Sequence, residues 1–320
     1  MARSEFQIIS DFFAPLASAP GAYGLTDDAA VLDIPEAYQL VVTSDTIISG
    51  VHFLDDDPPH NVACKALRVN LSDLAAMGAT PFGFFLACSF PKSVSEDWIA
   101  CFAEGLARDA STFGLSLMGG DTTATPGKAT FTITALGLVP RGQALCRRGA
   151  KAGDQIVVTG SLGDAALGLE ALCHKLPFLS PEHTQYLTDR YHFPQPRLWL
   201  PESIRPYIRA ALDISDGLLQ DLGHICALNG LGATIDSTAF PLSSATRACI
   251  NRDASFWEYV VSGGDDYELL CAVDPHVSLP EGSSDFQWTR IGCFESVPGC
   301  RVLGLSEGTC AFEKNGFQHF

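Results

Sequence analysis

The sequence lacks the motifs and segments that would assign it quickly to a familiar class of protein. Its 320 residues contain no GxxxxGK(S/T) phosphate loop, no GxGxxG, no protein-kinase HRD or DFG set and no GxSxG nucleophile elbow. No apolar run approaches the roughly 18 residues needed to span a bilayer, and Glu5 and Asp11 interrupt the signal-like N-terminal stretch. We therefore expect a soluble cytoplasmic protein that does not act at a membrane.

Paired cysteines and basic residues are also scarce. The eleven cysteines occur singly between Cys64 and Cys310 with no CxxC, which indicates free, mostly buried thiols rather than a zinc ribbon or redox pair. The chain contains only 20 Lys and Arg residues but 37 Asp and Glu residues. The resulting net charge of −17 repels nucleic acid and anionic membranes. A phosphate ligand would therefore need bound metal ions or a few locally placed basic residues.

The chain does have a large apolar fraction, arranged in alternating strand-like and helix-like segments. Hydrophobic residues make up 47% of the 320 residues, which is enough for about two domains of an α/β (α+β) fold. Strands are expected at 39–45, 82–90, 115–121, 130–139, 154–160 and 267–274. Amphipathic helices are expected at 61–79, 95–114, 163–176 and 216–230. The polar, glycine-containing stretch 140–154 divides the chain into domains 1–140 and 141–320.

Aspartates recur where apolar strands end or helices begin. They are Asp27, Asp28, Asp45 and Asp121 in the first half, and Asp213, Asp216, Asp265 and Asp266 in the second. Ligands of α/β proteins bind at strand ends, and carboxylates next to hydroxyls such as Ser44 are the hard oxygen ligands that Mg²⁺ takes. The alternative is that these aspartates cap helices and form Asx turns. A calcium module is disfavoured because no DxDxDG loop occurs.

Four other positions stand out, each with a structural alternative. Asp73 follows Asn70 by three residues on a polar helix face, which is either a functional patch or a solvated face. Arg147 belongs to a group of four basic residues within eleven positions, which favours phosphate contact over a plain surface charge. His52 is either a structural histidine whose ring is hydrogen-bonded within the protein or a residue that contacts the ligand. Phe317 either fills a hydrophobic gap or stacks on a flat heterocycle.

Eight motifs occur in the order seen in one enzyme family. They are GLTDDAAVL, TSDTIISGVHF, KALRVNLSDLAAMGATP, GGDTT, ALCRRGAKAGD, ALDISDGLLQDLGHI, SGGDDYELL and the terminal GFQHF. On these motifs the chain resembles the thiamine-monophosphate kinases over nearly its whole length, from about Phe6 to Phe320. The resemblance implies a two-domain fold like that of aminoimidazole ribonucleotide synthetase. In that fold the N-terminal domain forms the dimer and the ATP/Mg site, and the C-terminal α/β domain completes the cleft.

The same resemblance implies a reaction. ATP and thiamine monophosphate give thiamine diphosphate and ADP by direct in-line transfer, assisted by several Mg²⁺ ions, in a homodimer. The acceptor is itself a phosphate monoester whose second pKa is near ~6, so it is largely ionised at neutral pH. A general base is therefore dispensable.

The resemblance also implies roles for individual residues. The matching metal-binding positions are Asp28, Ser44, Asp45, Asp73, Asp121, Asp213 and Asp216, of which Asp45, Asp121 and Asp216 are the expected catalytic residues. The matching nucleotide-contacting positions are Gly120, Asp121, Arg147 and Ser215. The matching substrate-contacting positions are His52, Asp265 and Phe317.

The chain departs from the family pattern at three of its positions. Thr26 replaces the usual Gly, Ser49 replaces a frequent Glu, and Asp265 is one methylene shorter than the usual Glu. Because Asp265 lies on the substrate side, acceptor preference stays open. Two alternatives remain: a superfamily relative acting on another phosphate or carboxylate acceptor, and a non-catalytic metal- or nucleotide-binding scaffold. The retained Asp45, Asp73 and Asp121 argue against the scaffold.

Overall fold

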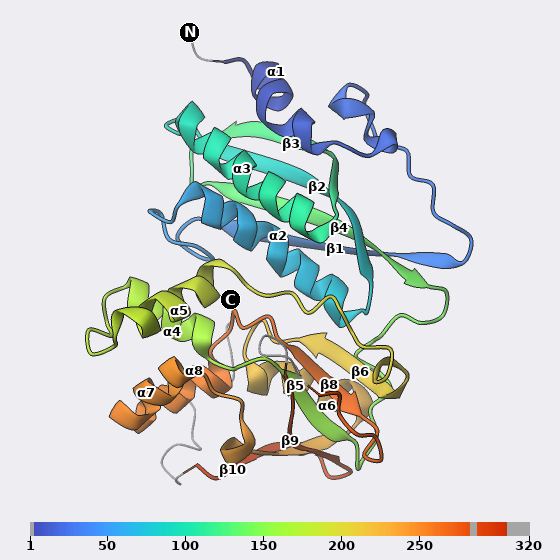
Figure 1. Ribbon diagram of the computed structural model, residues 1–320, viewed down its shortest axis with the longest axis vertical. Coiled ribbons are helices and arrows are strands. Elements are labelled where there is room, and N and C mark those ends of the chain that lie inside the picture. Colours follow the sequence, from blue (N-terminus) through green and yellow to red (C-terminus); the bar gives the residue numbers. More distant parts are fainter. Residues whose placement is uncertain (1–2, 282–286, 306–320) are drawn as a thin grey trace. The chain divides into compact units, whose positions relative to one another are not determined.

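A computed structural model of the chain describes residues 3–281 and 287–305 (Figure 1). The chain divides into two compact units. Unit 1 comprises residues 1–74 and 78–144, and unit 2 comprises residues 75–77 and 145–320. Each unit combines one β-sheet with helices, which confirms the predicted α/β (α+β) class. Within the described ranges no helix is long and apolar enough to cross a membrane.

Unit 1 is built on a four-stranded sheet with the strand order β1-β4-β2-β3. Its strands are β1 (Tyr38–Ile48), β2 (Thr80–Pro91), β3 (Ser116–Thr125) and β4 (Thr130–Pro140). β4 pairs antiparallel with β1 and with β2, whereas β2 pairs parallel with β3. The four strands predicted for this part of the chain are therefore confirmed, and β1 and β3 form the two edges of the sheet.

One face of this sheet is covered by two helices (Figure 1). They are α2 (Pro59–Ala76) and α3 (Glu96–Phe113). α3 begins where the Ser95 hydroxyl accepts the N–H of Trp98, and it ends at Gly114, whose φ of +70° is readily adopted only by glycine. Between helix and sheet the rings of Phe102 and Phe131 stack with centroids 4.4 Å apart. Both predicted helices of this unit are confirmed.

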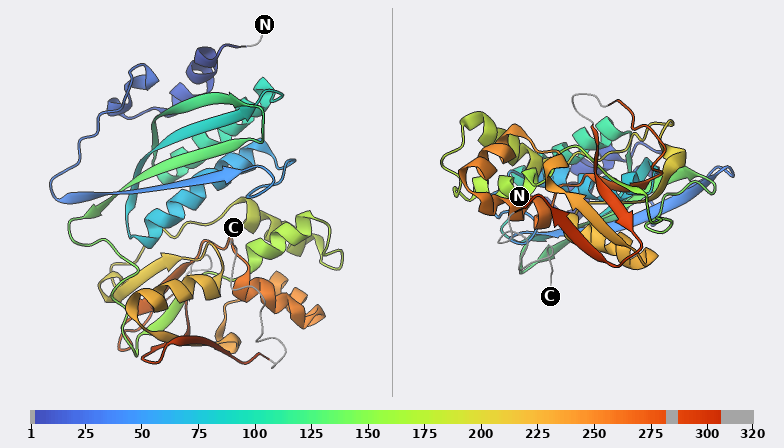
Figure 2. Two further views of the ribbon diagram at one scale, coloured as in Figure 1. Left: turned by 180° about the vertical axis from the view of Figure 1, so that it is seen from behind. Right: turned by 90° about the horizontal axis from the view of Figure 1, so that it is seen from below.

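The opposite face of the sheet is left open by the helices of the described chain, as the view from behind shows (Figure 2). Side chains of β1 alternate between the two faces, and Leu40 and Val42 are 38% and 55% exposed. Farther along β1, the hydroxyl of Ser44 lies 3.0 Å from that of Thr134 on β4. The open face thus has an apolar end and a hydroxyl-rich end.

Short helical segments precede β1. They are α1 (Glu5–Ile8), η1 (Ile9–Phe13), η2 (Ala14–Leu16) and η3 (Pro20–Leu25). The Ser116 hydroxyl at the start of β3 accepts the backbone N–H of Ala19 at 2.9 Å. This hydrogen bond fastens the N-terminal segment to the β3 edge of the sheet.

Unit 2 contains a six-stranded sheet with the order β10-β7-β9-β5-β8-β6. Its strands are β5 (Gln155–Thr159), β6 (Ile208–Asp213), β7 (Gly232–Asp236), β8 (Leu269–Val273), β9 (Trp288–Glu295) and β10 (Gly299–Leu303). Only β7 and β10 pair in parallel. Every residue of β8 is buried, so this strand belongs to the core of the unit. The predicted strands at 154–160 and 267–274 correspond to β5 and β8.

The helices of unit 2 are α4 (Asp164–Leu172), α5 (Pro181–His192), α6 (Leu218–Asn229), α7 (Ser244–Arg252) and α8 (Trp257–Ser262). Short 3-10 turns occur as η4 (Arg205–Tyr207), η5 (Ser237–Ala239) and η6 (Ala254–Phe256). The helices predicted at 163–176 and 216–230 are α4 and α6. Both begin slightly later than predicted because Gly163 and Gly217 adopt φ values of +80° and +123°, outside helical geometry.

Candidate functional site

The first group of predicted site residues lines a cavity within unit 1. The cavity has a volume of about 410 Å³ and lies where the N-terminal segment meets β2 and β3. Its polar wall includes Asp27, Asp28, Gly120, Asp121 and Thr122, and apolar residues such as Phe13 and Leu117 form the rest. Asp28 and the Gly120–Asp121 pair, which are far apart in the sequence, therefore meet at one site. The two carboxylates and the Thr122 hydroxyl are oxygen ligands of the kind that Mg²⁺ accepts.

Glycine is required at the centre of this wall. A Cβ atom at Gly120 would lie 1.8 Å from the backbone oxygen of Leu86 on the adjacent strand β2. A Cβ at Gly21 would likewise lie 1.9 Å from the backbone oxygen of Val31 in the N-terminal segment. Close backbone approach thus shapes the β3 wall of the cavity and also occurs within the N-terminal segment that forms the other wall.

A second group lies between β1 and α2. The Thr43 hydroxyl donates a short hydrogen bond to the Asp73 carboxylate, and the backbone N–H of Asp45 donates to Asn70 Oδ1 at 3.0 Å. The side chain of Asn70 is fully buried, and its amide donates to the Ala66 carbonyl at 3.0 Å. The alternative that this polar patch of α2 is a solvated face is therefore wrong. Asp45 and Asp73 instead present oxygen ligands at the β1 edge of the sheet.

The strand pairing keeps these two groups apart. Asp121 is aligned across the sheet with Ala87, Thr132 and Thr46, whereas Asp45 is aligned with Ile133, Leu86 and Gly120. Adjacent rows face opposite sides of a sheet, so Asp121 lies on the open side and Asp45 on the side of the helices. β1 and β3 are separated by three strand spacings, about 14 Å in all. Since a Mg²⁺ ion holds its ligands at about 2.1 Å, Asp45 and Asp121 of one unit cannot share one ion.

A third group lies in unit 2, where two glycine-containing turns touch. The backbone N–H of Asp265 donates to the Ser215 carbonyl at 2.9 Å. A Cβ at Gly264 would lie 2.3 Å from that same carbonyl oxygen, and one at Gly217 would lie 2.8 Å from the Ser262 carbonyl. The glycines of DISDG and SGGDD are therefore needed for backbone-to-backbone packing. As a result, Ser215 and its neighbour Asp216 lie beside Asp265.

Residues of this third group differ in exposure. Asp213, at the C-terminal end of β6, is only 4% exposed, and Ser215, Asp216 and Asp265 are half-buried. Asp265 adopts φ +66°, a left-handed conformation that aspartate tolerates better than most side chains.

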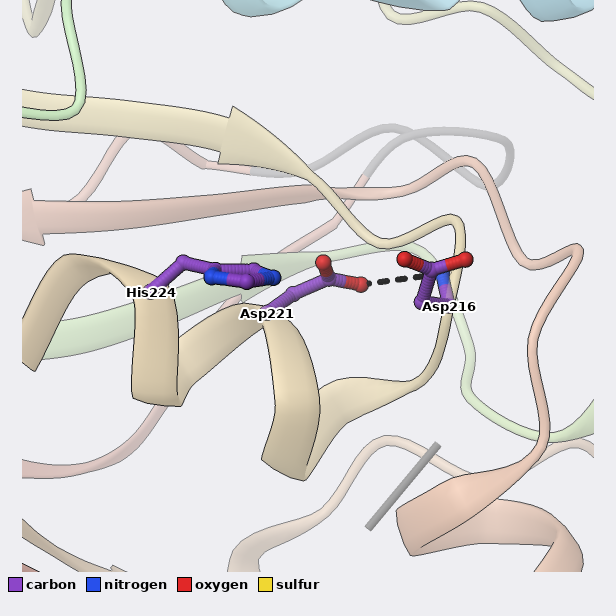
Figure 3. Close-up of side chains that lie close together, drawn as sticks. All are labelled: Asp216, Asp221 and His224. Carbon is purple, nitrogen blue, oxygen red and sulfur yellow. Dashed lines mark hydrogen bonds between the residues drawn. The ribbon is translucent and has the colours of Figure 1, made fainter. Parts of the chain in front are cut away.

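Two residues beside this turn were not predicted as site residues. Figure 3 shows Asp221 between Asp216 and His224, with potential ligand atoms of all three within 4.8 Å of one another. Asp221 Oδ2 accepts the backbone N–H groups of Ser215, Asp216 and Gly217 at 3.1 to 3.2 Å. The signal in the sequence was the i, i+3 spacing of Asp221 and His224 on the helix that follows DISDG.

The protonation of Asp221 reflects two opposing effects. Burial raises its pKa to about 7, and the negative charge of Asp216 acts in the same direction. The three backbone N–H donors oppose this rise because they stabilise the carboxylate. Asp221 therefore organises the turn that carries Asp216.

The remaining predicted residues lie elsewhere. His52 Nδ1 accepts the backbone N–H of Ile48 at 3.0 Å, so the ring carries no proton on Nδ1 and can present only Nε2 to a ligand. Arg147 is exposed, and its guanidinium makes no hydrogen bond or ion pair with residues 3–281 or 287–305. Its neighbour Arg148, in contrast, donates to the Leu228 carbonyl at 3.4 Å. Phe317 lies outside the described residues.

Comparison with known proteins gives consistent matches. Residues 26–139 match the family model described as AIR synthase related protein, N-terminal domain. The thiamine-monophosphate kinase of Salmonella typhimurium is 42% identical over 329 aligned residues, which cover 100% of this chain and 99% of that protein.

Solved structures agree with these sequence matches. The crystal structure of thiamine-monophosphate kinase from Stenotrophomonas maltophilia K279a has a TM-score of 0.77 and 39% identity, covering 88% of this chain and 90% of that one. The structure of AaThiL complexed with AMPPCP and TMP has a TM-score of 0.77 and 28% identity, covering 100% of this chain and 99% of that one.

Proposed function

The chain belongs to the thiamine-monophosphate kinase family, and from this premise we propose how its residues carry out the family's reaction. The protein catalyses the ATP-dependent phosphorylation of thiamine monophosphate to thiamine diphosphate, a step of thiamine diphosphate biosynthesis. The observation that carries this conclusion is the identity to a kinase of that name along the whole chain. The likeness to a structure that holds both AMPPCP and TMP supports it. We place the reaction in the cytoplasm.

Several Mg²⁺ ions are the proposed metal cofactors, and they would neutralise phosphate charge in a chain whose own net charge is −17. The oxygen donors found in unit 1 fit this metal. Asp28 and Asp121 would hold an ion in the cavity beside Gly120, and Asp45 with Asp73 would hold another at the β1 edge. In unit 2 the proposed ligands are Asp213 and Asp216. Within unit 1, the separation of Asp45 from Asp121 supports more than one ion.

The nucleotide is proposed to lie along the Gly120 wall of the cavity. There Gly120 and Asp121 of β3 line the same cavity as Asp28. Arg147, which has a free guanidinium among the described residues, and the hydroxyl of Ser215 are the proposed further contacts of the nucleotide. The γ-phosphoryl group would then pass in line to the acceptor phosphate, which is already ionised at neutral pH and needs no base.

The acceptor is proposed to contact His52, Asp265 and Phe317. His52 offers its Nε2–H as a donor to the acceptor. Asp265 offers a carboxylate to the permanently cationic thiazolium ring. Charge attraction of this kind acts on the bound substrate and not only on the transition state, so it chiefly sets affinity.

A homodimer built through unit 1 is the proposed assembly. The open face of its sheet exposes Leu40 and Val42, which are apolar side chains on a regular strand. The sequence alone suggests the segments 82–90 and 130–139 as contributors, and in the structure these segments are the inner strands β2 and β4. The strongly exposed apolar side chains of the sheet lie on β1, so we propose that β1 contributes as well.

The decisive experiment is a substrate panel. The purified protein is incubated with ATP, Mg²⁺ and one acceptor at a time: thiamine monophosphate, thiamine, or a phosphorylated purine precursor. We expect ADP and thiamine diphosphate to appear in equal amounts only with thiamine monophosphate, and chelation of Mg²⁺ to stop the reaction. Preferential turnover of a purine precursor would assign the chain to another branch of the superfamily. Binding without turnover of any acceptor would indicate a scaffold.

A further inference from the structure

The segment 263–268, which leads from α8 into β8, alternates between half-buried and fully buried side chains. Asp265 and Tyr267 are half-buried and adopt φ values of +66° and +51°. Asp266 and Glu268, the residues between and after them, are 0% exposed. Two left-handed non-glycine residues in one short segment persist only when the surrounding structure holds them there. The buried carboxylates are the evident source of that constraint.

Asp266 ties the segment to the start of α4. Both of its carboxylate oxygens accept the backbone N–H of Gly163, at 3.0 and 2.8 Å. Its own carbonyl accepts from Arg190 Nη2 at 3.3 Å. Asp266, the residue next to Asp265, is therefore fixed by hydrogen bonds to both its side chain and its backbone.

Glu268 ties the other end of the segment to two arginines. Arg197 donates to both carboxylate oxygens from Nε and Nη2, each at 2.6 Å, and Arg190 donates to Oε1 at 2.8 Å. The Thr159 hydroxyl donates a fourth hydrogen bond to this carboxylate, at 2.7 Å. A Cβ at Gly160 would lie 2.1 Å from Oε1, so glycine at that position leaves the space that the carboxylate fills. The bidentate Arg197 contact fixes Glu268 in direction as well as in place.

The backbone between these anchors is bonded to the DISDG turn. The N–H groups of Asp265 and Tyr267 donate to the carbonyls of Ser215 and Ile214, at 2.9 and 2.8 Å. The Ile214 N–H donates in return to the Glu268 carbonyl at 2.8 Å. The Asp265 carboxylate, which accepts from the Tyr267 hydroxyl at 3.2 Å, is thus the functional group presented by a segment anchored on both sides.

We propose that Asp266 and Glu268, with Arg190 and Arg197, are positioning residues that preset the Asp265 carboxylate for the cationic ring of the acceptor. This inference rests on the proposed function and deepens it, because it assigns acceptor affinity to a buried charge network that does not touch the acceptor. A carboxylate held in its binding position loses little conformational freedom when the acceptor arrives. Loosening the network therefore weakens acceptor binding without changing the charge at residue 265.

The test compares two arginines of unit 2. Arg197→Lys keeps the positive charge but cannot form two parallel N–H···O bonds to Glu268. We expect KM for thiamine monophosphate to rise roughly tenfold, with kcat within about twofold of wild type and KM for ATP unchanged. This pattern marks the loss of an interaction that holds the acceptor equally well in the ground state and in the transition state. Arg209→Lys is the matched control, because Arg209 also makes two hydrogen-bonded ion-pair contacts, with Asp154 and Asp274, away from this segment. It should lower the thermal midpoint and leave both KM values unchanged.

A second pair of variants keeps the test valid if an arginine variant folds poorly. Thr159→Val removes only the hydroxyl contacts, and we expect it to raise KM for thiamine monophosphate in the same selective way. Thr159→Ser restores the hydroxyl and should restore the wild-type KM. Asparagine tolerates the left-handed backbone, so Asp265→Asn tests the carboxylate itself. It should raise KM for thiamine monophosphate selectively, and by at least as much as any variant of the network.

The outcomes separate the inference from the function on which it rests. A wild-type protein that phosphorylates thiamine monophosphate, together with variants that lose only stability, would overturn the positioning role alone. An equal rise of both KM values would also overturn it, because the network would then act on the nucleotide side. A wild-type protein without turnover of thiamine monophosphate would overturn both proposals.

Discussion

Replacing Gly120 by alanine tests whether the cavity of unit 1 binds the nucleotide. The added Cβ would lie 1.8 Å from the Leu86 carbonyl oxygen, where real Cβ contacts are essentially never under 3.0 Å. The gap between β2 and β3 must therefore open by at least 1.2 Å, the difference between these two distances. β3 is an edge strand, so it can move, but Asp121 moves with it.

The size of the effect follows from the hydrogen bonds and the geometry. Loss of about two strand-pairing hydrogen bonds, at about 1 kcal/mol each, lowers the free energy of unfolding by about 2 kcal/mol. Misplacing a reacting group by about 1 Å can cost about 100-fold in rate, so we expect kcat/KM for ATP to fall by at least tenfold. Stability is measured by urea denaturation, and kcat/KM by ADP release at saturating thiamine monophosphate and Mg²⁺.

The matched control is Gly127→Ala, between β3 and β4 of the same unit. A Cβ there meets only the Thr125 hydroxyl at 3.5 Å, an ordinary contact, so stability and kcat/KM should stay near wild type. Gly120→Ala with wild-type stability and a kcat/KM for ATP within twofold of wild type would refute the reasoning. A loss of stability without a change in kcat/KM would show that β3 does not carry the nucleotide site.

Three further predictions concern metal binding, assembly and pH. Asp45→Asn should lower Mg²⁺-dependent turnover more than about 100-fold while the thermal midpoint stays within a few degrees, and near-normal activity in chelator-treated buffer would exclude this metal site. Light scattering should give twice the 34.2 kDa chain mass for the wild type and 34.2 kDa for Leu40→Asp, whose site is exposed in the single chain. The pKa of Asp221, raised by burial from 3.8 to about 7, makes a stabilising contribution that is fully present below pH 3.8 and is lost as pH rises through 7. Urea denaturation from pH 4 to 8 should therefore show stability falling more steeply for the wild type than for Asp221→Asn.

Sequence patterns alone predict the four strands and the two long helices of unit 1, and they identify the family. Alternating apolar residues specified β1 to β4, and helical spacing ending at Gly114 specified α3, because these periodicities depend only on neighbours along the chain. The ordered motifs, from GLTDDAAVL onwards, identified the family because several independent matches together exceed what any one motif could show. Asp28 and the GGD motif line one cavity, and their role in metal binding stays a prediction.

Only the tertiary structure decided how the acidic residues are grouped. Asp45 and Asp121 look equivalent in sequence, but strand order and register place them on opposite edges and faces of one sheet. Asp221 was overlooked because its role lies in three hydrogen bonds to a turn, and a turn closes only when the helix after it is packed. The left-handed backbone of Asp265 likewise depends on Glu268, Arg190 and Arg197, which meet only in the folded unit. Such contacts join residues as far as 109 positions apart, as for Thr159 and Glu268, and local patterns carry no information about them.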